Sequence, residues 1–127
     1  MNELQQRQLD FLEDTVKYYS EDTSRRAVTI GGSYCYYRTD DGRKCAIGRH
    51  IPDELYNESI ENKVIYSIIG FGCISDELRE LGMLFLMNVQ ELHDSDWYWV
   101  SGEGLSTEGG KWVYYIKRRI IEGNYLS

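Results

Sequence analysis

The sequence predicts a small α+β fold, a single globular domain of residues 1–127 in which about four helical segments pack around a β-hairpin. Three observations support this prediction. A length of 127 residues fits one domain, and 42% hydrophobic residues are enough to build a core. Apolar residues recur at helical spacing in several stretches. An Asp-Gly pair separates two runs of strand-forming residues, which favours a hairpin.

The two ends of the chain each predict an amphipathic helix, over Glu3–Tyr19 and over Thr107–Glu122. In both stretches, apolar residues three and four positions apart share one face. Gly123 follows the second stretch, and glycine commonly ends a helix. The residues expected to share these faces are Leu9, Leu12, Val16 and Tyr19 in the first helix, and Trp112, Ile116 and Ile120 in the last.

Residues Gly31–Gly48 predict the hairpin. Tyr34–Arg38 is rich in strand-forming residues, and Cys45–Ile47 is a suitable return strand. The Asp-Gly pair between them provides the turn, because glycine tolerates a positive φ.

Two pairings of these strands are open. A two-residue loop at Asp41-Gly42 would pair Arg38 with Cys45, whereas a three-residue loop at Asp40–Gly42 would pair Tyr37 with Cys45. We favour the three-residue loop, because two aspartates suit right-handed turn positions and a glycine suits the left-handed position that follows.

A short helical turn is expected at Pro52–Glu54, because proline suits the first helical position and acidic residues suit the positive end of a helix. The apolar, β-branched stretch Ile60–Ile69 predicts a further helix, which Gly70–Gly72 would end. Trp97–Val100 is expected to form a short strand or extended segment, followed by a loop at Ser101–Gly104.

The longest apolar stretch predicts a central helix over Asp76–His93, with Ser75 as its N-cap. Apolar residues cover well over half of its surface, which is typical of a helix at the centre of a domain. Leu81 and Phe85 are expected to be buried.

The charge of the chain argues against several classes of partner. There are 14 basic and 21 acidic residues, a net charge of -7 and a pI near 4.8. Such a chain is not expected to bind nucleic acid or an anionic membrane through its overall charge. Residues 1–20 are polar and do not resemble a signal peptide, so we expect a cytoplasmic protein.

Cysteine and histidine patterns do not predict a metal or another cofactor. Cys35, Cys45 and Cys73 are an odd set without a CxxC pair or a zinc-binding spacing, so we expect reduced, metal-free thiols. His93-Asp94 is compatible with metal ligation, but a histidine that favours the negative end of its helix explains the pair better.

Two groups of residues are candidate binding sites. The first is an acidic and aromatic cluster at the end of the central helix, which is expected to bind a protein partner: Glu91, Asp94, Asp96, Trp97, Tyr98 and Trp99. The second is a basic island beside tyrosines, which is the alternative ligand-binding site for a phosphate-bearing molecule: Tyr36, Arg38, Arg43, Lys44, Arg49 and His50. No catalytic residue is assigned.

Part of the chain resembles a family of small uncharacterised proteins from phages and prophage-bearing bacteria. The similar stretches are Cys35–Arg38, Asp41–Gly48, Ile51–Tyr56 and Gln90–Asp94, about half of the chain. Arg49 and His50 depart from the pattern, since smaller or apolar residues are expected there. The resemblance implies a cytosolic accessory protein of a phage or mobile element and carries no catalytic residue with it.

The sequence therefore favours a non-enzymatic protein that binds and inhibits or modulates a host protein, including proteins of anti-phage defence. The alternative is a small-molecule binder that sequesters a nucleotide signal on the basic island. A third interpretation is a hydrolase that pairs Cys35 or Cys45 with His50 or His93, although the predicted hairpin turns Cys45 toward the core. The oligomeric state does not follow from the sequence.

Overall fold

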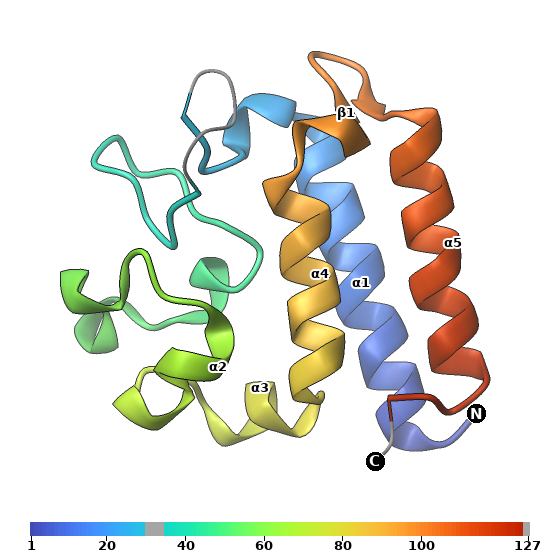
Figure 1. The fold of residues 1–127 in the computed structure, drawn as a ribbon, viewed down its shortest axis with the longest axis horizontal. Helices are drawn as coiled ribbons and strands as arrows, with labels where there is room; N and C mark the ends of the chain where they lie inside the picture. The colour runs from blue at the N-terminus through green and yellow to red at the C-terminus, as the bar shows by residue number, and fades with distance from the viewer. Residues whose placement is uncertain (30–34, 126–127) are drawn as a thin grey trace.

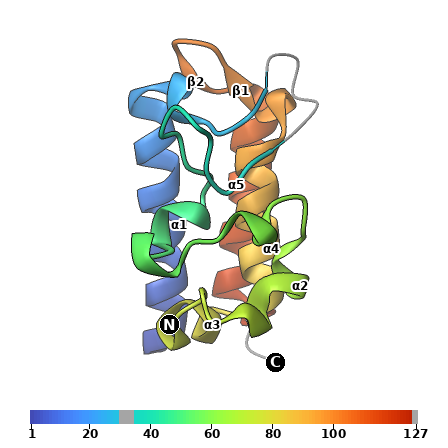
Figure 2. The same cartoon turned by 90° about the vertical axis from the view of Figure 1, so that its left-hand side faces the viewer.

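The computed structural model describes residues 1–29 and 35–125, which form a small α+β domain (Figure 1). Three helices lie side by side: α1 (Glu3–Glu21), α4 (Met83–Asp94) and α5 (Thr107–Ile121). The part of the chain between Cys35 and Ser75 is mostly loops and 3-10 turns. It packs on the side of α4 opposite α5 (Figures 1 and 2).

The remaining elements are short. The turn α2 (Ile65–Ile68) lies within the irregular half, α3 (Asp76–Glu80) leads from it into α4, and β1 (Trp99–Val100) and β2 (Gly104–Leu105) lie between α4 and α5. The strands β1 and β2 form an antiparallel hairpin in which Trp99 pairs with Leu105 and Val100 with Gly104. The predicted loop Ser101–Gly104 is confirmed over Ser101–Glu103, since Gly104 belongs to β2. Asp96–Tyr98 is a 3-10 turn, so only Trp99–Val100 of the predicted Trp97–Val100 strand is extended.

The two terminal helices are confirmed, with one change in the buried face of α1. Leu12 and Tyr19 are fully buried, whereas Leu9 and Val16 are only half-buried. Gln5 and Gln8 take buried positions instead, because each side-chain amide donates to a main-chain carbonyl at a helix end: Gln5 Nε2 to Ile120 O and Gln8 Nε2 to Leu81 O, both 2.8 Å. The polar side chains thereby add a bond to carbonyls at helix ends, and Ile120 O also accepts from the amide of Gly123 at 3.0 Å.

The prediction of a single central helix over Asp76–His93 is wrong. This stretch forms two helices, α3 and α4, which are separated at Leu81 and Gly82, and Gly82 has a φ of +100°. Leu81 and Phe85 are buried as predicted, and Ser75 caps α3. The helix α4 is not enclosed on all sides, because Leu84 and Met87 are exposed.

The tip of the hairpin predicted over Gly31–Gly48 has the three-residue loop. Arg38 forms an antiparallel bridge with Lys44, which is the register that pairs Tyr37 with Cys45. The amide of Thr39 donates to Arg43 O at 2.9 Å, and Gly42 has a φ of +90°. Residues 30–34 lie outside the described residues.

The prediction of a return strand at Cys45–Ile47 in that hairpin is wrong. After the Arg38–Lys44 bridge, Cys45–Ile47 turns into a 3-10 helix at Gly48–His50 instead of continuing as a strand. A Cβ at Gly48 would lie 2.0 Å from Tyr37 O, so this close approach requires glycine.

The helix predicted over Ile60–Ile69 is also mostly wrong. Only the single turn α2 is α-helical, with 3-10 turns at Glu58–Ile60 and Ile69–Phe71 on either side. Asn62 has a left-handed φ of 63°, which a continuous helix excludes. The predicted break at Gly70–Gly72 is confirmed, since Gly72 has a φ of +78°. The predicted turn at Pro52–Glu54 is confirmed as a 3-10 helix at Asp53–Leu55.

Candidate functional site

A pocket of about 490 Å³ opens between the C-terminal half of α4 and the irregular half of the molecule. We call it the α4 pocket. It brings together Glu91 and Asp94 of the predicted acidic and aromatic cluster with Tyr36 of the predicted basic island. The lining residues are Cys35, Tyr36, Tyr37, Asn62, Lys63, Val64, Ile65, Met87, Gln90, Glu91, Asp94 and Ser95.

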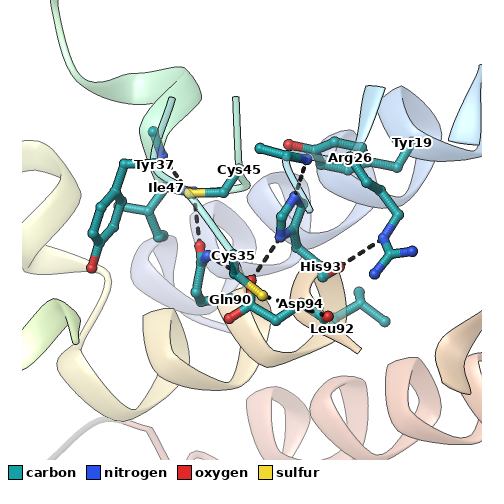
Figure 3. Close-up of polar contacts among 12 residues, drawn as sticks. Tyr19, Arg26, Cys35, Tyr37, Cys45, Ile47, Gln90, Leu92, His93 and Asp94 are labelled. Atoms are coloured by element: carbon teal, nitrogen blue, oxygen red, sulfur yellow. Dashed lines mark hydrogen bonds and ion pairs between the residues drawn. The ribbon is translucent and has the colours of Figure 1, made fainter. Parts of the chain in front are cut away.

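The carboxylate of Asp94 is held rigidly at the edge of this pocket (Figure 3). Its Oδ1 lies 2.7 Å from His93 Nδ1 and accepts from Gln90 Nε2 at 2.9 Å. Gln90 Oε1 in turn accepts from the amide of Ile47 at 3.2 Å. The Cys35 thiol also hydrogen-bonds to the Asp94 side chain, which is one cause of the raised pKa of Cys35. The carboxylate is therefore held through Oδ1 by His93 and Gln90, and no Lys or Arg side chain of the described residues pairs with it.

His93 is a structural residue with both ring nitrogens occupied. Its Nε2 accepts from the amide of Ala27 at 3.0 Å, so the ring proton belongs on Nδ1, which donates to Asp94. Burial lowers the pKa of His93 below its ordinary value, so the ring is neutral at pH 7. Among the described residues no group of three or more His, Cys, Asp and Glu side chains is arranged to hold a metal ion.

The thiols are not activated as nucleophiles. Burial raises the pKa of Cys45 to about 12, and its sulfur accepts from the amide of Gly48 at 3.2 Å. Burial and the nearby Asp94 also raise the pKa of Cys35 to about 12. Both side chains are therefore thiols at neutral pH, and the thiolate is the nucleophilic form. The geometry gives no support to the cysteine-dependent hydrolase.

The predicted acidic and aromatic cluster divides into exposed and buried members. Trp97 is 68% exposed, and Glu91 also faces solvent. Asp96 is exposed but pairs with Arg26 at 2.9 Å. The expectation that Trp99 is an exposed anchor is wrong, because its ring is 7% exposed and its Nε1 donates to Leu92 O at 2.7 Å.

Tyr98 begins an aromatic column that the sequence analysis missed. Its ring stacks on Trp112 with centroids 5.8 Å apart, and Trp112 stacks on Tyr115 at 5.0 Å. Burial together with Glu91 and Glu108 raises the pKa of Tyr98, which places both carboxylates near this phenol. The spacing of Trp112 and Tyr115 on α5 is the one local pattern from which the stack could have been expected.

The basic island is neutralised from within the protein. Arg38 and Lys44 pair with Asp53, Arg43 with Asp41, and Arg49 with Asp14. Arg43 also donates to the carbonyls of Arg26 and Val28, and the ring of His50 packs on Phe11. These cations stabilise local structure, so the geometry gives no support to the phosphate site predicted there.

Comparisons with known protein families, with curated proteins and with solved structures give no match to this chain. Within the described residues, no helix has the length and apolar character needed to cross a membrane.

Proposed function

We propose that this protein is a phage-type accessory protein of the host cytosol that binds a basic surface of a host protein and inhibits it without catalysis. The observation that carries the proposal is the exposed Trp97 beside an acidic face. We define the acidic-aromatic face by Glu91, Asp94, Asp96, Trp97 and Tyr98, without the buried Trp99. Trp97 is 68% exposed and lies three residues after the end of α4, whose last turn carries Glu91 and Asp94, and this is the composition of a binding hot spot.

Charge favours a basic partner. Glu91 and Glu108 lie near Tyr98, and the net charge of the chain is -7. Acidic side chains around an aromatic anchor speed the encounter with a positively charged surface and disfavour acidic ones. A nucleic-acid-binding groove of a host or defence protein is one surface of this chemistry.

The competing functions have weaker support. The cations that would bind a nucleotide signal pair with neighbouring aspartates. The thiols that a hydrolase would need have raised pKa values. A Cys35→Ser variant tests the hydrolase directly, because loss of function with an intact fold and intact partner binding would indicate chemistry at that sulfur.

The proposal is tested by capture of partners from an extract of the host on immobilised protein, with Trp97→Ala as the variant. Tyr66→Ala is the matched control, because Tyr66 is 71% exposed on α2 and outside the acidic-aromatic face. Trp97→Ala should weaken binding by more than about 2 kcal/mol, as for a hot spot, and rising salt should weaken binding further. Capture that is the same for both variants and insensitive to salt would contradict this site.

A further inference from the structure

The α4 pocket combines apolar walls with the Asp94 carboxylate, which no Lys or Arg side chain of the described residues pairs with. Val64 and Met87 are 63% and 41% exposed, and both lie in its lining with Tyr36. The acidic groups are Asp94 and Glu91, from successive turns of α4. A ligand must therefore offer an apolar stem and a positive end.

The cations of the protein do not fill this role. Lys63 lines the pocket, but its Nζ donates to Ser59 O at 2.5 Å and lies 5.8 Å from the ring of Phe71. Arg26, the other nearby cation, donates to His93 O and pairs with Asp96. The charge of Asp94 is thus left for an external partner, within the residues that the structure describes.

We propose that the α4 pocket binds an arginine side chain of the partner protein, with the guanidinium on Asp94 Oδ2 and Glu91 and the methylene stem against Met87 and Val64. Arginine fits better than lysine, because its planar guanidinium is less strongly hydrated than an ammonium and donates to two acceptors at once. This inference rests on the proposed function and gives the chemistry of the contact that the partner makes.

The rigidity of Asp94 supports this assignment. The neutral His93 and the amide of Gln90 hold its Oδ1 at 2.7 and 2.9 Å, and Gln90 is itself fixed by the amide of Ile47. A carboxylate positioned in advance loses little conformational freedom on binding, so more of the interaction appears as affinity.

The variant Asp94→Asn isolates the negative charge of this carboxylate. An asparagine keeps an oxygen that accepts from His93 and Gln90, but it puts an amide donor in place of the charged Oδ2. The control is Glu103→Gln, which removes an equal charge from an exposed side chain outside both the pocket lining and the acidic-aromatic face.

Titration with N-acetyl-arginine amide, followed by amide and methionine-methyl NMR shifts, measures the interaction without any partner protein. We expect shifts at Met87, Gln90 and Asp94, and binding that Asp94→Asn weakens by about tenfold or more while Glu103→Gln leaves it within about twofold. N-acetyl-citrulline amide, an uncharged isostere, should not bind at the same concentrations.

Equal binding of citrulline, tighter binding of N-acetyl-lysine amide, or no effect of Asp94→Asn would overturn the assignment. If Asp94→Asn fails to fold, Met87→Lys provides the test, because it places a cation at the exposed wall of the pocket and should abolish arginine binding. Failure of the proposed function gives a different result from failure of this inference. In that case N-acetyl-arginine amide would still bind in the α4 pocket, although capture of a host protein would not depend on Trp97.

Discussion

The two halves of this molecule are held together by different interactions. In the helical half, α1, α4 and α5 bury apolar faces against one another, with Leu12, Phe85 and Ile116 fully buried. In the irregular half, from Cys35 to Ser75, side chains bind main-chain groups far away in the sequence. Apolar periodicity therefore describes the first half. The second half also buries apolar residues, such as Ile47, Ile60 and Ile68, but without a regular spacing, and polar contacts fix the course of the chain between them.

Glu61 shows how the irregular half is organised. Its carboxylate accepts from the amides of Tyr37 and Arg38 at 2.9 and 3.1 Å, and from the hydroxyl of Tyr56 at 2.6 Å. One side chain thus replaces several bonds of a strand ladder. The carbonyl of Lys44 accepts from Tyr19 on α1 in the same way. These contacts explain why a chain segment with few regular elements has a defined course.

The largest expected effect lies in the helical half. Phe85→Ala should reduce the free energy of unfolding by about 3–5 kcal/mol, because it leaves a cavity at a fully buried site. Leu84→Ala is the matched control on the same helix turn. Leu84 is 45% exposed, so its truncation should cost less than about 1 kcal/mol. Urea unfolding of both variants measures the difference, and equal losses would break the comparison.

The sequence could predict the elements that depend on local patterns. The amphipathic spacing of α1 and α5, the cap at Ser75 and the turn at Gly42 all follow from neighbouring residues. The separation of α3 from α4 depends on Gln8, which donates to the carbonyl of Leu81 from 73 positions away. No apolar pattern contains such a contact, so a single long helix was predicted instead.

For the candidate site, the sequence also predicts the local features but not the contacts between distant residues. Alternation along Trp97–Trp99 requires that at least one ring faces away from the core, but not which one. Trp99 is buried because its indole reaches Leu92 O, and Trp97 is exposed. The fixing of Asp94 through Gln90 depends on the amide of Ile47, which is 43 residues from Gln90. The sequence thus names the acidic residues as candidates, whereas the network that positions Asp94 depends on contacts between residues far apart in the chain.

In the irregular half, we expect the largest effect from Glu61→Ala. The loss of an acceptor shared by two main-chain amides should cost about 1–3 kcal/mol. Glu58→Ala is the control, because Glu58 is exposed in a neighbouring turn and should change stability by less than about 0.5 kcal/mol. Hydrogen exchange should quicken at the amide of Cys45, which donates to Tyr37 O, before it changes in α5. Uniform destabilisation of both halves would contradict this local role.

Acid should weaken the contact of His93 with the amide of Ala27, which follows α1. Burial lowers the pKa of His93 from its usual 6.5, so the unfolded chain takes up a proton near that pH while the folded protein does not. The contribution of His93 is thus complete above about pH 6.5 and declines below it, by at most about 1.4 kcal/mol per pH unit. Urea unfolding at pH 7.5 and 5.5 tests this. His50→Gln serves as background, because burial and Arg49 also lower the pKa of His50. Equal stability of that variant at both pH values would contradict a buried, neutral His93.

The smallest effect distinguishes two adjacent glycines at the start of α5. A Cβ at Gly110 would meet no atom within 4 Å, so Gly110→Ala should only remove backbone freedom from the unfolded chain. We expect it to stabilise the protein by about 0.5–1 kcal/mol, which is the helix-propensity difference between the two residues. At Gly109 the same Cβ would lie 2.1 Å from Tyr98 O, so Gly109→Ala must displace the turn that carries Tyr98 and Trp97. Thermal unfolding should therefore give opposite signs for the two variants. If Gly110→Ala lowers the stability instead, local helix propensity does not determine the stability even of this regular helix. The proposed difference between the helical half and the irregular half would then be contradicted.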